Sequence, residues 1–147
     1  LHGVSMGAAT VLMASGEDLP GNVKAVIADC GYTSEWDEFR READALHIPW
    51  FPVLNATSVL SKIRDGYDFK QASALAQVKK SRIPTLFIHG SSDELVPYSM
   101  LGELYAAAAC EKEELTVEGA GHALSSSVAP TLYWRTVEDF IAKYLDR

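Results

Sequence analysis

Apolar and polar residues follow one another along the chain in blocks that predict strands and helices in turn. Residues 23–30 (VKAVIADC) and 85–89 (TLFIH) are nearly continuous apolar runs, typical of parallel strands covered on both faces. A shorter run, residues 114–118 (ELTVE), alternates. Apolar residues at helical spacing mark residues 97–109 and 132–145 as helices, and residues 6–15 are apolar nearly all round, which predicts a buried helix. This order predicts an α/β fold with a doubly wound, mostly parallel sheet.

Residues 33–83 interrupt that order, because about fifty residues without a strand exceed one crossover helix and its loops. Ser34 followed by Asp37 or Glu38 is typical of a capped helix start, and this helix should run to about residue 46. A proline-rich break follows, and a second helix is expected over residues 56–64. An aromatic-rich helical insert is the usual form of a cap over an active site. Ordinary core packing of its aromatic residues is the alternative.

Composition and charge narrow the class of protein. The 147 residues are 48% hydrophobic and 22% charged, as in globular proteins. The net charge of -7, without a basic cluster larger than Lys79-Lys80, argues against nucleic acid or an anionic membrane as partner. No apolar run is long enough for a membrane span. No signal peptide is visible, but an absent N-terminus would hide one, so this carries little weight for the expectation of a cytoplasmic protein.

The two cysteines give no sign of a metal centre or of a disulfide. Cys30 and Cys110 lack the spacing of metal ligands, and two cysteines in a domain of ordinary size are usually free and buried. The chain supplies no other ligand cluster that its spacing would reveal. We therefore expect neither a metal nor an organic cofactor.

Near the start of the chain, Gly3-Val4-Ser5-Met6-Gly7 matches G-x-S-x-G between a strand end and a helix. This is the pattern of a nucleophile elbow. We expect both glycines to be required, because side chains beside the strained turn would collide with the neighbouring helix and strand. The turn exposes the serine hydroxyl, and the backbone N–H of Met6 should point to where an oxyanion would form.

Two further residues follow predicted strands, where they could complete a catalytic triad. Asp93 lies in the loop after residues 85–89, and His122 lies in a glycine-rich loop after residues 114–118. Serine, aspartate and histidine in this order are typical of α/β-hydrolases, and differ from the orders in trypsin and subtilisin. The expected roles are Ser5 as nucleophile, His122 as general base and Asp93 as the acid that orients the imidazole.

The remaining candidates have simpler expected roles. Glu94 should point away from the triad, and Asp29, at the end of a strand, should accept hydrogen bonds from loop N–H groups. His2 and His89 are expected to be packed or hydrogen-bonded within strands. Candidates for lining an acyl pocket are Tyr32, Trp50 and Phe51.

The chain resembles the α/β-hydrolase superfamily in residues 1–7, in residues 83–90 with Asp93 and Val96-Pro97, and in Gly121-His122. It looks most like bacterial serine esterases near the dienelactone hydrolase and prolyl oligopeptidase branch. This resemblance implies an eight-stranded sheet whose fifth strand precedes the nucleophile. We therefore expect residues 1–147 to be the C-terminal half of one domain, with the cap inserted at residues 33–83. The missing N-terminal half of the same polypeptide would then be a partner that supplies the second oxyanion donor.

The activity implied is hydrolysis of a small or medium carboxylic ester through an acyl-enzyme, without a cofactor. A serine peptidase of the prolyl oligopeptidase kind would use the same three residues. Acyl transfer to an acceptor other than water, and a catalytically silent scaffold of the same fold, are further alternatives. A homo-oligomer is also expected, because an unpaired strand beside the elbow favours association.

Overall fold

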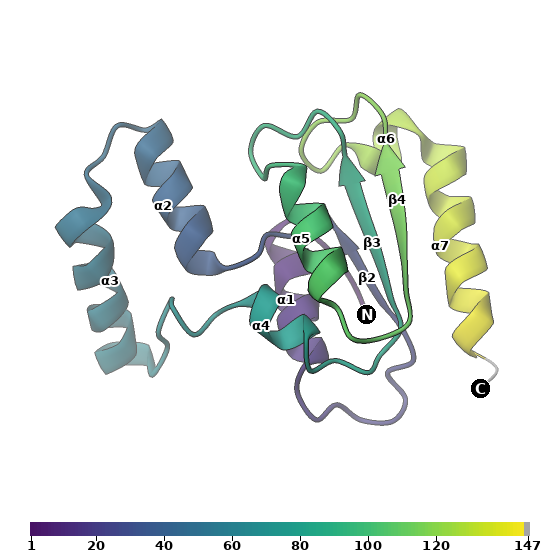
Figure 1. Cartoon of the computed structure of the whole chain (residues 1–147), viewed down its shortest axis with the longest axis horizontal. Coiled ribbons are helices and arrows are strands. Elements are labelled where there is room, and N and C mark those ends of the chain that lie inside the picture. The colour runs from purple at the N-terminus through teal and green to yellow at the C-terminus, as the bar shows by residue number, and fades with distance from the viewer. Residues whose placement is uncertain (146–147) are drawn as a thin grey trace.

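The computed structural model describes residues 1–145, and its centre is a four-stranded parallel sheet with helices on both faces (Figure 1). The strands lie side by side in chain order, and they are β1 (His2–Val4), β2 (Val26–Asp29), β3 (Thr85–Gly90) and β4 (Lys112–Val117). The helices are α1 (Met6–Ser15), α2 (Glu35–Ala45), α3 (Trp50–Asp65), α4 (Ala74–Val78), α5 (Ser99–Ala107), α6 (Ser125–Val128) and α7 (Pro130–Leu145). The α/β fold predicted from the sequence is confirmed.

Alternate residues of the central strands supply two separate cores. On one face, Val26, Ala28 and Phe87 pack against α1, α4 and α5. On the other face, Leu86 and Ile88 belong to a cluster formed with α7. Because successive side chains of a strand point to opposite faces, a strand between two helical layers must be apolar throughout. This explains the continuous apolar runs in the sequence.

The register of the sheet brings the carboxyl ends of the strands to one edge. Val4 pairs with Asp29, Asp29 with Ile88, and Gly90 with Val117. The loops that follow the four strands therefore leave the sheet side by side. In open parallel sheets this edge is where ligands bind.

Several predicted boundaries move. The strand predicted over residues 23–30 is shorter, because the Val23 N–H donates to Pro20 in a turn and Cys30 adopts a left-handed φ of 48°. The strand predicted over residues 114–118 begins earlier, at Lys112, which pairs with Thr85. The helix predicted over residues 97–109 is limited to Ser99–Ala107.

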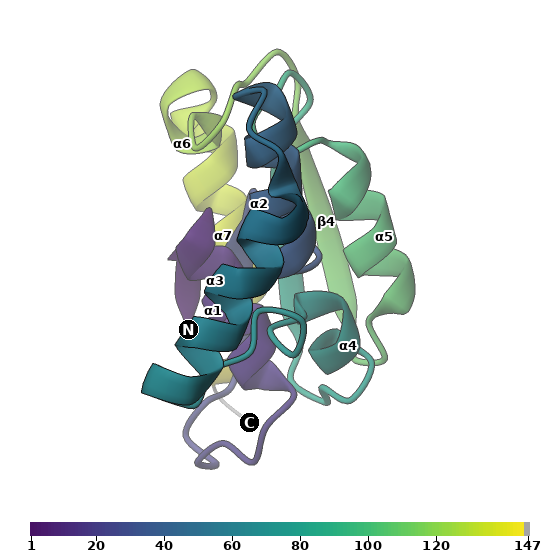
Figure 2. The same ribbon diagram turned by 90° about the vertical axis from the view of Figure 1, so that its left-hand side faces the viewer.

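The predicted insert at residues 33–83 contains three helices that differ in position. Ser34 caps α2, accepting the Asp37 N–H at 3.1 Å, as predicted. The next helix begins earlier than expected, at Trp50, and is irregular at Phe51. These two helices, α2 and α3, project to one side of the sheet (Figures 1 and 2). By contrast, α4 packs in the core with α1 and α5, so the projecting part of the insert is α2 with α3.

Among the helices between residues 1 and 145, none is both long and apolar enough to cross a bilayer.

Candidate active site

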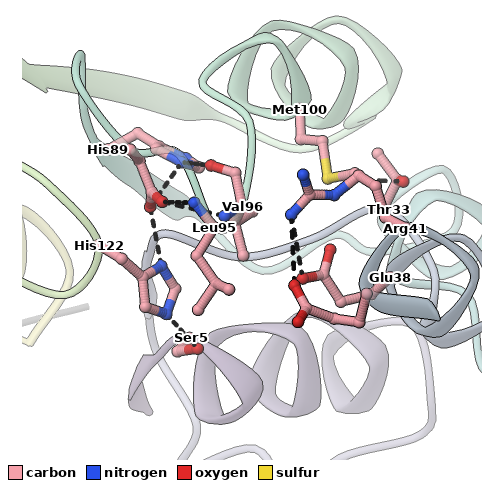
Figure 3. A network of polar contacts seen from close by, with 11 residues as sticks. Ser5, Thr33, Glu38, Arg41, His89, Leu95, Val96, Met100 and His122 are labelled. Carbon is pink, nitrogen blue, oxygen red and sulfur yellow. Dashed lines mark hydrogen bonds and ion pairs between the residues drawn. The ribbon is translucent and has the colours of Figure 1, made fainter. Parts of the chain in front are cut away.

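A continuous hydrogen-bond relay joins Ser5, His122 and Asp93 at the carboxyl edge of the sheet (Figure 3). Ser5 Oγ lies 2.8 Å from His122 Nε2, and His122 Nδ1 lies 2.9 Å from Asp93 Oδ2. Because an ionised carboxylate only accepts hydrogen bonds, Nδ1 carries the imidazole proton. In the neutral ring Nε2 is then free to accept the proton of the serine hydroxyl. The structure thus brings together the three residues predicted as a triad, which come from the loops after β1, β3 and β4.

The backbone at Ser5 is strained, as expected for a nucleophile elbow. Its φ of 55° and ψ of -120° lie outside the regions that L-residues ordinarily adopt. A hydrogen bond of 2.8 Å from the Ser5 N–H to the Asp29 carbonyl helps to hold this turn against β2. The hydroxyl is thereby presented above the strand end.

The two glycines of the motif are not equivalent, and the expectation that both are required for steric reasons is wrong for one of them. A Cβ at Gly3 would lie 2.1 Å from the Gly7 carbonyl oxygen. A Cβ at Gly7 would meet no described atom within 4 Å beyond its chain neighbours and the backbone of its own helix. Gly3 is therefore required by the close approach of β1 and α1, whereas Gly7 is not constrained within this chain.

Met6 is the first residue of α1. The first N–H groups of a helix have no carbonyl partner within it, and they lie at its positive end. Along α1, the Ala9 N–H is the one that reaches back to the Ser5 carbonyl, at 3.1 Å. The Met6 N–H, directly after Ser5, is thus a candidate donor to a negatively charged oxygen, and its role there stays a prediction.

Asp93 is held by donors on both of its carboxylate oxygens. The side chain is fully buried. Oδ1 accepts the backbone N–H groups of Leu95 at 3.0 Å and Val96 at 2.9 Å, while Oδ2 accepts His122. The neighbouring Glu94 is exposed. The turn therefore places Asp93, and not Glu94, next to His122, and its N–H groups fix the orientation of the Asp93 carboxylate.

Asp29 is almost completely buried, but its hydrogen-bond donors differ from those expected. Its side chain accepts the Ser125 hydroxyl at 3.1 Å, and the Tyr133 hydroxyl also hydrogen-bonds to it. Burial raises the pKa of Asp29, while these two hydroxyls oppose the rise. The predicted loop N–H donors are thus replaced by side-chain hydroxyls. Ser125 lies 96 residues away in the sequence, so no local pattern could have identified it.

The two strand histidines are hydrogen-bonded, as predicted. His2 Nε2 lies 3.0 Å from the Tyr133 hydroxyl. His89 is 1% exposed, and its Nε2 lies 3.0 Å from the Val96 carbonyl oxygen and 3.3 Å from Asp93 Oδ2. Sequence reasoning missed this contact between His89 and Asp93.

The three residues predicted to line an acyl pocket occupy different surroundings. Tyr32 is buried against Ala9, Val96 and Met100. Burial raises the pKa of its phenol, and the charges of two glutamates of α2 add to the rise. Trp50 and Phe51 contact each other at the start of α3, which lies on the far side of α2 from the sheet (Figure 1). Their role in substrate binding stays a prediction.

One residue of α2 lies close enough to the relay to sense its charge. Burial raises the pKa of the Glu38 carboxyl, and His122 is among the groups that oppose the rise. In Figure 3 the exposed side chain of Leu95 lies between His122 and Glu38. The insert therefore adjoins the site through α2.

Within residues 1–145, one group of side chains has the donors of a metal site, and it overlaps the relay. Ligand atoms of Cys30, Asp93 and His122 lie within 4.8 Å of one another. Burial raises the pKa of the Cys30 thiol to about 12. At neutral pH the group thus offers a protonated thiol, which binds metals poorly, and a carboxylate and imidazole already bonded to each other.

A parallel sheet between two helical layers, with a serine on a strained turn after one strand, defines an α/β-hydrolase. The chain belongs to the prolyl oligopeptidase family, whose model matches residues 1–147. It is 33% identical over 144 residues to YqkD of Bacillus subtilis, an uncharacterized protein, and the match covers 96% of this chain and 47% of YqkD. Family and fold together place the chain in the prolyl oligopeptidase branch of the α/β-hydrolases.

Solved structures share the fold. The esterase domain of a Rhodothermus marinus protein matches with a TM-score of 0.68 and 21% identity, over 99% of this chain and 60% of that one. An acylaminoacyl peptidase of Pyrococcus horikoshii matches with a TM-score of 0.71 and 16% identity, over 100% of this chain and 24% of that one. The chain thus spans about half the length of YqkD and less than two thirds of that esterase domain.

Proposed function

We propose that this protein hydrolyses carboxylic esters, with Ser5 as nucleophile, His122 as general base and Asp93 as orienting acid. The observation that carries the proposal is the unbroken relay, with distances of 2.8 Å from Ser5 Oγ to His122 Nε2 and 2.9 Å from His122 Nδ1 to Asp93 Oδ2. Nucleophile, base and orienting group within hydrogen-bonding distance are what covalent catalysis by a serine requires.

In the proposed reaction, Ser5 Oγ attacks the ester carbonyl while its proton moves to His122 Nε2. Asp93 stabilises the imidazolium that forms, and the Met6 N–H donates to the negatively charged oxygen of the tetrahedral intermediate. The C–O bond to the alcohol then breaks, and the alcohol leaves with the proton from Nε2. A water molecule then attacks the acyl carbon while its proton moves to the same nitrogen. The bond from the acyl carbon to Ser5 Oγ breaks, and His122 gives this proton to Ser5 Oγ.

One oxyanion donor from this chain is half of the usual pair. In the fold the second N–H comes from a loop after the third strand of the complete sheet. Because the chain spans about half the length of YqkD, we propose that the complete protein supplies this donor from outside residues 1–147. Loss of one such donor typically costs about 10²- to 10³-fold in turnover.

A peptidase is the second candidate, favoured by the family match and by the likeness to an acylaminoacyl peptidase. The chemistry is the same except that the leaving group is an amine, which must be protonated by His122 as it departs. The relay serves both reactions, so substrate assays must separate them.

The test compares p-nitrophenyl esters of short and medium acyl chains with aminoacyl-anilides, using the complete protein. The proposal predicts a higher kcat/KM on esters, and loss of that activity in Ser5→Ala. Faster cleavage of anilides would favour the peptidase. Unchanged ester hydrolysis in Ser5→Ala would overturn the assignment of the nucleophile.

A further inference from the structure

His89, at the carboxyl end of β3, is a buried histidine that contacts Asp93 directly. Its Nε2 lies 3.0 Å from the Val96 carbonyl oxygen and 3.3 Å from Asp93 Oδ2 (Figure 3). The residue is 1% exposed, and its ring meets that of Tyr98 edge-on at 6.0 Å between centroids. Packing thus fixes the direction in which this nitrogen points.

The position of the His89 proton follows from the partner of Nε2. A carbonyl oxygen can only accept a hydrogen bond, so Nε2 must carry a proton to bond to Val96. The same nitrogen lies 3.3 Å from Asp93 Oδ2, so the positive end of this N–H group is next to the carboxylate. The bond to the Val96 carbonyl also anchors the turn whose N–H groups hold Oδ1.

His89 completes the surroundings of Asp93. The two backbone N–H groups of Leu95 and Val96 hold Oδ1, whereas Oδ2 is hydrogen-bonded to His122 and in contact with His89. Without His89, rotation of the carboxylate about its bond to Cβ would be opposed at Oδ2 by His122 alone. The Val96 carbonyl would also be left buried and unpaired, which costs free energy.

We propose that His89 is a positioning residue of the active site, which holds Asp93 in the orientation that Asp93 imposes on His122. The inference rests on the proposed function, since it concerns the same relay. His89 acts through Asp93 and neither contacts substrate nor transfers a proton in the reaction. Its removal should therefore lower kcat and leave KM unchanged.

Three variants of the complete protein separate positioning from mere stability. His89→Phe keeps a ring but removes the donor, and His89→Gln keeps an N–H near the place of Nε2. Tyr133→Phe is the matched control, because Tyr133 is 1% exposed and its hydroxyl bonds to His2 and Asp29, neither of which contacts the side chains of the relay. Should His89→Phe fail to fold, His89→Asn replaces it, since its amide is too short to reach Asp93.

We expect His89→Phe to lower kcat by about tenfold at constant KM, because a less restricted Asp93 holds His122 less often in the reactive orientation. His89→Gln should recover most of this loss, and Tyr133→Phe should lose thermal stability while keeping kcat. The His122 Nδ1 proton, observed as a low-field NMR resonance, should shift or broaden in His89→Phe and return in His89→Gln.

The inference is overturned if His89→Phe keeps kcat within about twofold of the wild type, because Asp93 would then be held equally well without His89. It is also overturned if His89→Phe and His89→Gln lose activity equally and in proportion to their loss of melting temperature. Ser5→Ala is assayed alongside. If that variant stays active, the proposed function fails, and if it is inactive while His89→Phe is normal, only the role of His89 fails.

Discussion

The buried polar groups of the site at the edge of the sheet have hydrogen-bond partners more fully than those of the insert beside it. Both oxygens of Asp93 have donors, and its side chain is fully buried. In α2, by contrast, Glu35 Oε2, Glu38 Oε2 and Arg41 Nε are buried without a hydrogen-bond partner among the described residues. Buried polar atoms are usually paired, because an unpaired one costs its desolvation. The site is preorganised, whereas the polar groups of α2 are not fully matched.

Apolar residues show the same contrast. Leu86, at the centre of β3, is fully buried, whereas on α3 Leu60 is 62% and Ile63 78% exposed. Large apolar side chains in water add nothing to stability. The comparison teaches that the sheet and its loops hold the relay in place, whereas α2 and α3 leave more apolar side chains exposed and more buried polar atoms unpaired.

Asp93→Asn should produce the largest effect, because it alters the preorganised region at its centre. An amide at this place favours the wrong tautomer of His122, and the same change in another Ser-His-Asp triad lowers kcat by about 10⁴-fold. Glu94→Gln, at the exposed neighbouring position, should leave kcat unchanged. The kcat for ester hydrolysis is measured with the two purified variants. An active Asp93→Asn would mean that Asp93 does not orient His122.

The two glycines of the elbow allow a matched steric test of the same region. Gly3→Ala places a Cβ 2.1 Å from the Gly7 carbonyl, so β1 and α1 must separate. We expect a stability loss of about 1–3 kcal/mol and, if Ser5 moves by about 1 Å, a roughly 100-fold loss of activity. Gly7→Ala should fold and react normally, because its Cβ meets no described atom within 4 Å. Chemical denaturation measures the stability of the two variants, and kcat/KM measures their activity. Equal losses in Gly3→Ala and Gly7→Ala would contradict the contact geometry.

Amide hydrogen exchange tests whether the insert is less protected than the sheet. Because α3 has few buried apolar residues and β3 is buried along its whole length, the amides of α3 should exchange faster, by about tenfold or more. The measurement is native-state exchange followed by mass spectrometry of peptides from both elements. Equal protection in α3 and β3 would make the insert a fixed structural element.

Glu38→Gln should produce the smallest effect, on the pH dependence of stability. Burial raises the pKa of Glu38 above its usual 4.5, so the folded state favours the neutral acid. The stability associated with this neutral carboxyl is present below pH 4.5 and is lost as the pH rises through the higher folded pKa. Glutamine stays neutral, so the variant should gain melting temperature over the wild type at pH 8 but not at pH 4, by about 2–4 °C.

The control for this measurement is Glu42→Gln, since Glu42 also pairs with Arg41, at 3.8 Å, but its side chain is 40% exposed. Its melting temperature should change little with pH relative to the wild type. A gain in Glu38→Gln that is the same at both pH values would mean that burial of the charge is not its cause.

Sequence alone could predict the parts of the site that local pattern encodes. Ser5 lies in a recognisable motif, and Asp93 and His122 follow strands whose apolar runs are continuous or alternating, so parallel pairing brings them to one edge. The supporting contacts could not be predicted in this way. Ser125 reaches Asp29 across 96 residues, and the His89 contact with Asp93 depends on the turn at Val96.

The insert was the least predictable region, for a physical reason. A helix start is usually marked by a capping side chain, but Pro49 precedes α3 without a side-chain cap, and Phe51 is not helical. The true start at Trp50 therefore had no signal. The end of the same helix did have a signal in the sequence, because Gly66 adopts the left-handed conformation expected of a glycine after a helix.

Covalent labelling with a fluorophosphonate tests the central claim most directly. Such a reagent reacts with a serine that a neighbouring histidine activates, and the modified residue is located by mass spectrometry of peptides. The account predicts that the label lies on Ser5 in the complete protein, and that Ser5→Ala and His122→Ala are not labelled. Undiminished labelling of Ser5→Ala, at another residue, would contradict it.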